Sequence, residues 1–231
     1  MLADAAVAPV AALVADRTRA AMLQALGDGR ALPACELALE GGVKAPTASA
    51  HLAKLVDGGL LRVEQRGRNK VYRLASPQVA RLLEALATLA RPASPGTFRE
   101  ARHGRELRLA RSCYDHLAGR LGVAVTETLV RGGSLRPRGT AYVLTERGER
   151  TLARLGVDVA RARAARRAFA RPCLDWSERR HHLAGALGAV LLEHLLHGDW
   201  LQRRRSGRSL AVTERGWRGL QAALGVERIR D

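Results

Sequence analysis

The sequence predicts a mainly α-helical protein of the α+β class that carries small β-hairpins and has two parts of different design. In the first part, apolar residues recur at the three- and four-residue spacing of amphipathic helices. A short basic turn then separates two runs that are typical of the strands of a β-hairpin. In the second part, three short sequences occur twice in the same order, which indicates an internal duplication.

Helical periodicity accounts for most of the first part. The stretch Ala5–Leu26 is divided by Asp16, which stands where the N-cap of a second helix would fall. Further helices are expected between Gly and Pro residues that begin or end them. They are Ala34–Leu39, a helix from Pro46 to the Gly58-Gly59 pair, and Gln78–Leu89.

A β-hairpin is predicted between the last two of these helices. Leu60–Gln65 and Lys70–Leu74 would be its strands, and Arg66-Gly67-Arg68-Asn69 would be its tight turn. We therefore assign residues 1–91 to an N-terminal domain. Residues 92–106 are rich in Pro, Gly and charged side chains, so they are predicted to be a linker.

Residues 107–231 are predicted to form a duplicated C-terminal domain that serves sensing or dimerisation, with repeats at about 108–158 and 168–227. The matching segments are His116–Gly122 with His182–Gly188, Leu144–Gly148 with Val212–Gly216, and Leu155–Asp158 with Leu224–Glu227. Each copy is expected to be a helix–hairpin–helix unit that begins with one long helix. Two units too small to bury their own apolar faces would then pack together as one domain.

The details of the repeats follow from local signals. The hairpin tips are expected at Arg136–Gly139 and Arg203–Arg208, and Thr145 and Thr213 are expected to cap the closing helices. A very basic helix, Ala160–Ala170, is predicted to join the two copies.

The charge balance indicates a polyanionic partner. The chain has 39 basic and 22 acidic residues and a formal net charge of +17, most of it after residue 92. All but three of the basic residues are arginines, whose planar side chains donate two hydrogen bonds to phosphates and base edges. Double-stranded DNA is therefore the leading candidate, and the C-terminal domain is expected to add positive surface beside it.

Composition also excludes several classes of protein. No run of about 18 apolar residues exists that would span a membrane, and no basic segment precedes the mild Ala/Val run at the start. Three cysteines argue against a disulfide scaffold and fit a reducing compartment, so we expect a cytoplasmic protein. The preference for Arg over Lys and the many alanines are typical of a GC-rich bacterial genome.

The strongest functional motif begins at Pro46. A helix that enters the major groove of DNA needs apolar anchors on one face and short polar side chains near its N-terminal end. Thr47, Ser49 and His51 meet this requirement and are predicted to contact base edges. The residues predicted to contact phosphates are Lys54 on the same helix and Arg66, Arg68 and Lys70 at the following hairpin.

These motifs resemble those of the ArsR/SmtB winged helix-turn-helix repressors. The resemblance covers residues 8–90 and rests on Asp16-Arg17-Thr18-Arg19, on Thr47–Leu55, and on Gly59-Leu60-Leu61 with the hairpin that follows. It implies a homodimer that is paired through the first and last helices of the N-terminal domain. It also implies a palindromic operator and release of the DNA by an inducer.

The sensing sites of that family do not carry over to this chain. The arsenic-type site places two or three cysteines in the helix before the recognition helix, where this chain has Cys35 alone. The zinc-type site needs Asp, His and Glu on the closing helix, and Pro77–Leu89 contains no His. Any sensing site is therefore expected in the C-terminal domain.

Two cysteines at matching places in the repeats are the candidates for that site. Cys113 and His116 are three residues apart, a spacing that would place them on one face of a helix as half of a soft-metal site. Cys173 with His181 or His182 would supply the other half, and His182 is preferred. Zinc or copper is the expected metal. The alternatives are thiol oxidation, a purely structural role, and a small ligand in a pocket walled by Trp176 or Trp200.

No catalytic constellation is found in the sequence, so we do not expect an enzyme. Phosphate-binding glycine loops, zinc-protease motifs and nucleophile elbows are all missing. The sequence therefore predicts a sequence-specific transcriptional regulator, most simply a repressor that an inducer releases. The alternative is a nucleoid or RNA-binding protein that uses its arginines without reading bases.

Overall fold

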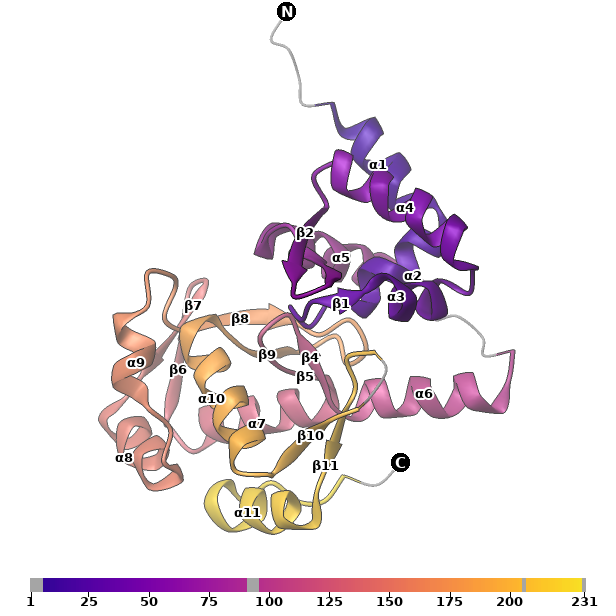
Figure 1. The fold of residues 1–231 in the computed structure, drawn as a ribbon. Coiled ribbons are helices and arrows are strands. Elements are labelled where there is room, and N and C mark those ends of the chain that lie inside the picture. Colours follow the sequence, from indigo (N-terminus) through magenta and orange to yellow (C-terminus); the bar gives the residue numbers. More distant parts are fainter. Residues whose placement is uncertain (1–5, 91–95, 205–206, 230–231) are drawn as a thin grey trace, which may run out of the picture. The chain divides into compact units, whose positions relative to one another are not determined.

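The computed structural model describes residues 6–90, 96–204 and 207–229 of the chain and divides into two units between Leu83 and Glu84. Figure 1 shows the order of the elements along the chain. The division falls within the helix that the sequence places last in the N-terminal domain. Within the described residues, no helix has the length and apolar character that crossing a membrane requires.

The first part is built mainly of helices. Its elements are α1 (Val7–Ala15), α2 (Arg17–Ala25), β1 (Leu32–Pro33), α3 (Ala34–Gly41), α4 (Ala45–Asp57), β2 (Leu61–Arg66), β3 (Asn69–Leu74) and α5 (Pro77–Leu89). The predicted cap is present, because the Asp16 carboxylate accepts a 2.8 Å hydrogen bond from the Arg19 backbone N–H at the start of α2. Gly42 ends α3 in the left-handed conformation, with φ of 65°.

The predicted hairpin is confirmed and is part of a small sheet. Strands β2 and β3 are antiparallel from Leu61↔Leu74 to Arg66↔Asn69, and β1 pairs with the other edge of β3. Leu61, Val71 and Leu74 are buried, whereas the tip of the hairpin is exposed. The strand β1 was not predicted, because two residues are too few to show alternation.

A helix core holds this unit together. Its fully buried side chains come from α2, the segment after it, α3 and α4, and they are Met22, Leu23, Leu26, Leu37, Leu52 and Leu55. All of these residues except Leu26, which directly follows α2, belong to the apolar periodicity of their own helices, so most of the core follows from the sequence pattern.

The second unit repeats one order of elements twice. After α6 (Phe98–Leu109) come β4 (Arg111–Cys113), β5 (His116–Ala118), α7 (Gly119–Arg131), β6 (Leu135–Arg138), β7 (Ala141–Leu144) and α8 (Glu146–Leu155). The helix α9 (Val159–Ala164) precedes β8 (Arg171–Leu174), β9 (His181–Ala184), α10 (Gly185–His197), β10 (Leu201–Arg203), β11 (Leu210–Val212) and α11 (Glu214–Leu224). Both halves therefore run hairpin, helix, hairpin, helix.

The capping predictions for this unit are confirmed. The Thr145 hydroxyl accepts a hydrogen bond from the Gly148 N–H at 3.0 Å, and the Thr213 hydroxyl accepts one from the Gly216 N–H at 2.8 Å. The predicted hairpin of the first copy is present, but its turn lies at residues 139–140, because Arg136, Pro137 and Arg138 belong to the strand β6. Part of the second tip, residues 205 and 206, is outside the described residues.

Three local predictions for this part of the chain were wrong. Phe98–Leu109 is helical, although the sequence led us to expect a linker up to residue 106; Thr97 and Glu100 form a capping box at its start. The basic helix predicted for Ala160–Ala170 ends at Ala164. The carbonyls of Ala168, Phe169 and Ala170 accept hydrogen bonds from other elements, and these tertiary bonds replace the helical ones.

The third error concerns the start of each repeat. A β-hairpin precedes α7 and another precedes α10, where the sequence predicts one long helix. Tyr114 and Arg179 adopt positive φ angles of 58° and 57° at the turns of these hairpins, so neither segment continues as a helix.

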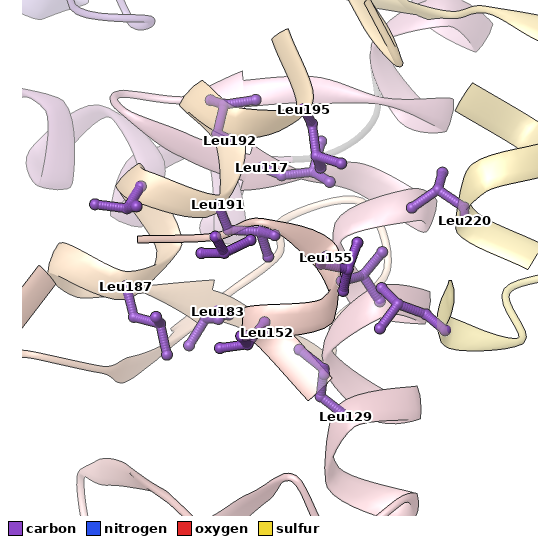
Figure 2. Close-up of a cluster of buried hydrophobic side chains, with 14 of the residues drawn as sticks. Leu117, Leu129, Leu152, Leu155, Leu183, Leu187, Leu191, Leu192, Leu195 and Leu220 are labelled. Atoms are coloured by element: carbon purple, nitrogen blue, oxygen red, sulfur yellow. The ribbon is translucent and has the colours of Figure 1, made fainter. Parts of the chain in front are cut away.

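The two halves share one apolar core (Figure 2). The labelled leucines in Figure 2 come from both halves, for example Leu129 on α7, Leu152 on α8 and Leu191 on α10. Each of these hairpins packs against the helix of the other half: β5 of the first half contacts α10, and β9 of the second half contacts α7. We call this arrangement exchanged packing. Strands β5 and β9 also contact each other.

Candidate functional site

The helix α4 has one buried and one exposed face. Ala48, Leu52 and Leu55 are buried in the core of the N-terminal unit. Thr47, Ser49 and Lys54, which the sequence assigns to DNA contact, are exposed on the helix surface outside this buried stripe. The Ser49 hydroxyl donates a 3.0 Å hydrogen bond to the Ala45 carbonyl, which leaves its oxygen able to accept a further bond.

His51 has a different environment from the other three. Its side chain is half-buried, and Nδ1 lies 3.6 Å from a carboxylate oxygen of Asp16. The backbone N–H of Arg19 bonds the same carboxylate and holds the pKa of Asp16 below its usual range. The imidazole therefore lies beside the N-terminus of α2, with Asp16 as its nearest charged neighbour.

The hairpin tip presents the predicted basic side chains to solvent. Arg66, Arg68 and Lys70 are all exposed, and Arg66 forms a loose ion pair with Glu64 at 3.8 Å. Sequence reasoning missed Lys44, which is exposed at the N-cap position of α4. Its signal was present, because Lys44 immediately precedes the motif that begins with Ala45-Pro46.

The predicted Cys/His residues meet in the C-terminal unit. One ligand atom from each of Cys113, His116, Cys173 and His182 lies within 4.8 Å of all the others. Cys113, His116 and His182 are buried and Cys173 is half-buried. His181, the alternative to His182, is exposed.

The geometry of this cluster differs from the one expected. Cys113 and His116 do not share a helical face; they are directly paired across the hairpin β4–β5. Cys173 and His182 are paired in the same way across β8–β9, although eight residues separate them in the chain. The longer loop of the second hairpin absorbs the difference in spacing. Each hairpin therefore contributes one thiol and one imidazole.

A carboxylate accompanies each imidazole. His116 Nδ1 lies 3.2 Å from Asp115 Oδ1, and His182 Nδ1 lies 3.3 Å from Asp175 Oδ2. The centroids of the two imidazole rings are 5.1 Å apart. With Nδ1 of each ring next to a carboxylate, Nε2 is the nitrogen that remains for the cysteines.

Asp175 connects the cluster to its surroundings. The fully buried Arg111 donates to Asp175 Oδ1 at 2.9 Å, and the N–H of Gly119 at the start of α7 donates to Oδ2 at 2.6 Å. Burial opposes ionisation of this carboxyl, but the contact with His182 and the charge of Arg111 hold its pKa far below the usual range. The guanidinium of Arg111 also stacks 4.4 Å from the ring centroid of Trp176.

The pKa values of the Cys113 and Cys173 thiols are shifted in opposite directions. A hydrogen bond from the Cys113 thiol, together with the nearby imidazoles, lowers the pKa of Cys173 to about 2 in spite of burial. The same contact with Cys173 and the burial of the side chain raise the pKa of Cys113 well above its usual value. The contact with Asp175 and the Cys173 thiolate raises the pKa of His182 against the effect of burial.

The other candidates lie elsewhere. Cys35 is exposed on α3 of the N-terminal unit. Two hollows of about 530 and 430 Å³ occur in the C-terminal unit, and neither Trp176 nor Trp200 lines them. Sequence reasoning missed the role of Asp175, although an Asp two residues after each cysteine was a visible signal.

The chain is similar to known DNA-binding regulators in sequence and in structure. A model described as a helix-turn-helix domain matches residues 14–64. The uncharacterized HTH-type transcriptional regulator YdfF of Bacillus subtilis is 40% identical over 221 residues, which is 96% of this chain and 98% of that protein. The HTH-type transcriptional regulator KmtR of Mycobacterium tuberculosis is 38% identical over 90 residues, which is 39% of this chain and 68% of KmtR.

Among solved structures, similarity was found to a homodimeric winged helix-turn-helix domain of Mycobacterium bovis, described as a possible ArsR-family regulator. It is 29% identical and covers 38% of this chain and 89% of that domain, with a TM-score of 0.34. The similarity to YdfF extends over nearly the whole of both chains. The chain therefore belongs to the HTH-type transcriptional regulators.

Proposed function

We propose that this regulator is a repressor that binds a specific duplex operator as a homodimer and is released by an inducer acting on its C-terminal unit. The exposed face of α4 next to a basic hairpin is the observation that carries the proposal. A helix of this kind fits the major groove, and the hairpin then reaches neighbouring phosphates.

The proposed DNA-contacting residues fall into two groups, one that contacts base edges and one that contacts phosphates. Thr47 and Ser49 contact base edges, because both are short, polar and exposed near the N-terminus of α4. His51 joins them when its imidazole turns away from Asp16. The side chains assigned to phosphates are Lys44, Lys54, Arg66, Arg68 and Lys70.

The homodimer is supported by exposed apolar side chains on α1 and α5. Val7 and Val10 on α1, and Leu86 and Leu89 on α5, are all exposed. These are the two helices through which the resemblance to ArsR repressors implies pairing. Two-fold pairing would present two copies of α4 to a palindromic operator.

The duplicated C-terminal unit, in which each half runs hairpin, helix, hairpin, helix, is proposed to receive the inducer. Three kinds of inducer remain in view: a soft metal, an oxidant of thiols, and a small ligand. The buried cluster of two cysteines and two histidines favours the first two over the third.

Selection from a random duplex library tests sequence-specific binding. The full-length protein is expected to enrich one palindromic motif, and fluorescence anisotropy should then show at least about 1000-fold preference for it over random DNA. Equal affinity for the motif, random duplex and RNA would contradict the proposal and favour a nucleoid or RNA-binding role. Repression itself is tested by a reporter placed behind the selected motif, and activation of that reporter would contradict it.

A further inference from the structure

We propose that Cys113, His116, Cys173 and His182 form a closed four-coordinate centre for one zinc ion, which joins the two halves of the C-terminal unit. The inference goes beyond operator binding and does not depend on it. Its evidence is the donor set, the unsatisfied imidazole nitrogens, the neighbouring carboxylates and the placement of the ligands on two hairpins.

The donor set and its size fit a single ion. Zinc binds sulfur at about 2.3 Å and imidazole nitrogen at about 2.0–2.1 Å, which places tetrahedral ligand atoms about 3.3–3.8 Å from one another. The four atoms here already lie within 4.8 Å of one another. A closure of about 1 Å by side-chain rotation would complete the tetrahedron. Two sulfurs and two nitrogens in this arrangement are typical of zinc.

The imidazole nitrogens point to a missing partner. The Nε2 atoms of His116 and His182, and the Nδ1 atom of His182 as well, are buried and have no hydrogen-bond partner among the described residues. Such buried polar atoms are rare in folded proteins and call for an ion or water. Asp115 and Asp175 stand at the Nδ1 atoms, and a carboxylate in that position orients a histidine toward a metal and makes it a stronger ligand.

The charges also balance around a divalent cation. Two thiolates and one Zn²⁺ give no net charge, which suits a buried site. The negative charge of Asp175 is matched by Arg111, whose side chain is completely buried beside it. The cluster therefore does not need another counter-ion when the metal is bound.

A disulfide between Cys113 and Cys173 is the competing explanation for the same cysteines. It would leave both Nε2 atoms buried without a partner, and each unsatisfied group costs about 1–3 kcal/mol. A metal satisfies the two imidazoles and the two sulfurs together. All four positions are then taken by protein side chains, which is typical of a structural zinc site.

The four ligands come from both halves of the C-terminal unit, so the ion would crosslink them. One Cys–His pair comes from the hairpin β4–β5 and the other from β8–β9, and strands β5 and β9 contact each other. The ion therefore crosslinks the first and second halves of the unit. Gly122 and Gly188 allow each histidine to approach the helix of the other half closely. A Cβ at either position would lie within 3.5 Å of the Cβ of that histidine.

Metal analysis of the full-length protein, purified under anaerobic conditions without added reductant, tests the proposal. We expect about one zinc per chain by inductively coupled plasma mass spectrometry, and native mass spectra heavier than denatured spectra by one zinc. Replacement by Co²⁺ should give the intense visible absorption of a tetrahedral site and a near-ultraviolet thiolate-to-cobalt band. Iron in place of zinc, or a denatured mass lower by two hydrogens with no bound metal, would overturn the proposal.

Paired variants identify the ligands. Cys173→Ser and His182→Ala should lose the bound zinc, whereas Cys35→Ser and His181→Ala, which alter the exposed counterparts, should keep it. Should the first pair fail to fold, His182→Cys provides a second test, because it preserves a ligand. That variant should bind Co²⁺ with a stronger thiolate-to-cobalt band. Zinc retention in Cys173→Ser at the wild-type level, or an unchanged cobalt spectrum in His182→Cys, would contradict the assignment.

Discussion

At the scale of single residues, Asp175 has the greatest structural influence in the C-terminal unit. Its carboxylate accepts hydrogen bonds from Arg111, Gly119 and Ser177 and stands next to His182. Asp115 occupies the matching place in the first half, but it is partly exposed and pairs with Arg167. The same residue type therefore has a buried role in one half and a surface role in the other.

Replacing Asp175 with Asn should strongly destabilise the protein. The amide has the same shape but no charge, so the buried guanidinium of Arg111 loses its counter-ion, a change that costs about 3–5 kcal/mol. Asp115→Asn is the control and should cost no more than about 1 kcal/mol. Urea unfolding of both variants after metal removal measures the difference. Equal losses in the two variants would contradict the role given to Asp175.

At the scale of elements, α4 and the hairpin β2–β3 are expected to affect DNA binding in different ways. Ser49→Ala should cost about 1–3 kcal/mol on the selected operator and relax specificity at one base position. Arg68→Ala should weaken binding to all sequences alike and reduce the slope of log affinity against log salt by about 1. Salt titrations on operator and random duplexes check both expectations. A loss of specificity in the Arg68 variant would contradict this division.

The exchanged packing of hairpins and helices depends on a glycine in α10. A Cβ at Gly188 would lie 2.5 Å from the Leu183 carbonyl oxygen and 3.2 Å from the Cβ of His116. Gly188→Ala should therefore force α10 away from the two hairpins and cost about 1–3 kcal/mol. Gly104→Ala on α6 meets only the end of Arg108 at 3.5 Å and should be neutral or stabilising. Thermal unfolding compares the two variants, and an unperturbed Gly188 variant would show that the helix and hairpin are not tightly packed.

At the scale of the whole molecule, the proposed homodimer depends on apolar surface that one chain leaves exposed. Leu89 at the end of α5 is 84% exposed, and Leu39 on α3 is 82% exposed. Leu89→Glu should weaken the dimer without unfolding the chain, because the charge would be buried at the interface. Leu39→Glu adds the same charge at equal exposure and should leave the dimer intact. Analytical ultracentrifugation distinguishes them, and a dimer of unchanged affinity in Leu89→Glu would contradict this interface.

Much of the N-terminal unit could be predicted from the sequence because its signals are local. The Asp16 cap, the apolar positions of α4 and the turn at Gly67 each depend on neighbours within a few residues. The candidate cluster was predicted only in part. Repetition in the sequence identified Cys113, His116, Cys173 and His182, but it placed the first two on a helix.

By itself, the sequence determined the class of protein, the caps of its helices and the residues of the Cys/His cluster. Only the tertiary structure decided that these residues face one another across two hairpins, with Asp175 and Arg111 buried beside them. The reason is physical. Helical periodicity and caps are set by residues a few positions apart, whereas the cluster joins residues from two halves of the unit. The two halves come together because they share one apolar core. The apolar surface buried in that core offsets the entropy lost when distant segments of the chain are brought together.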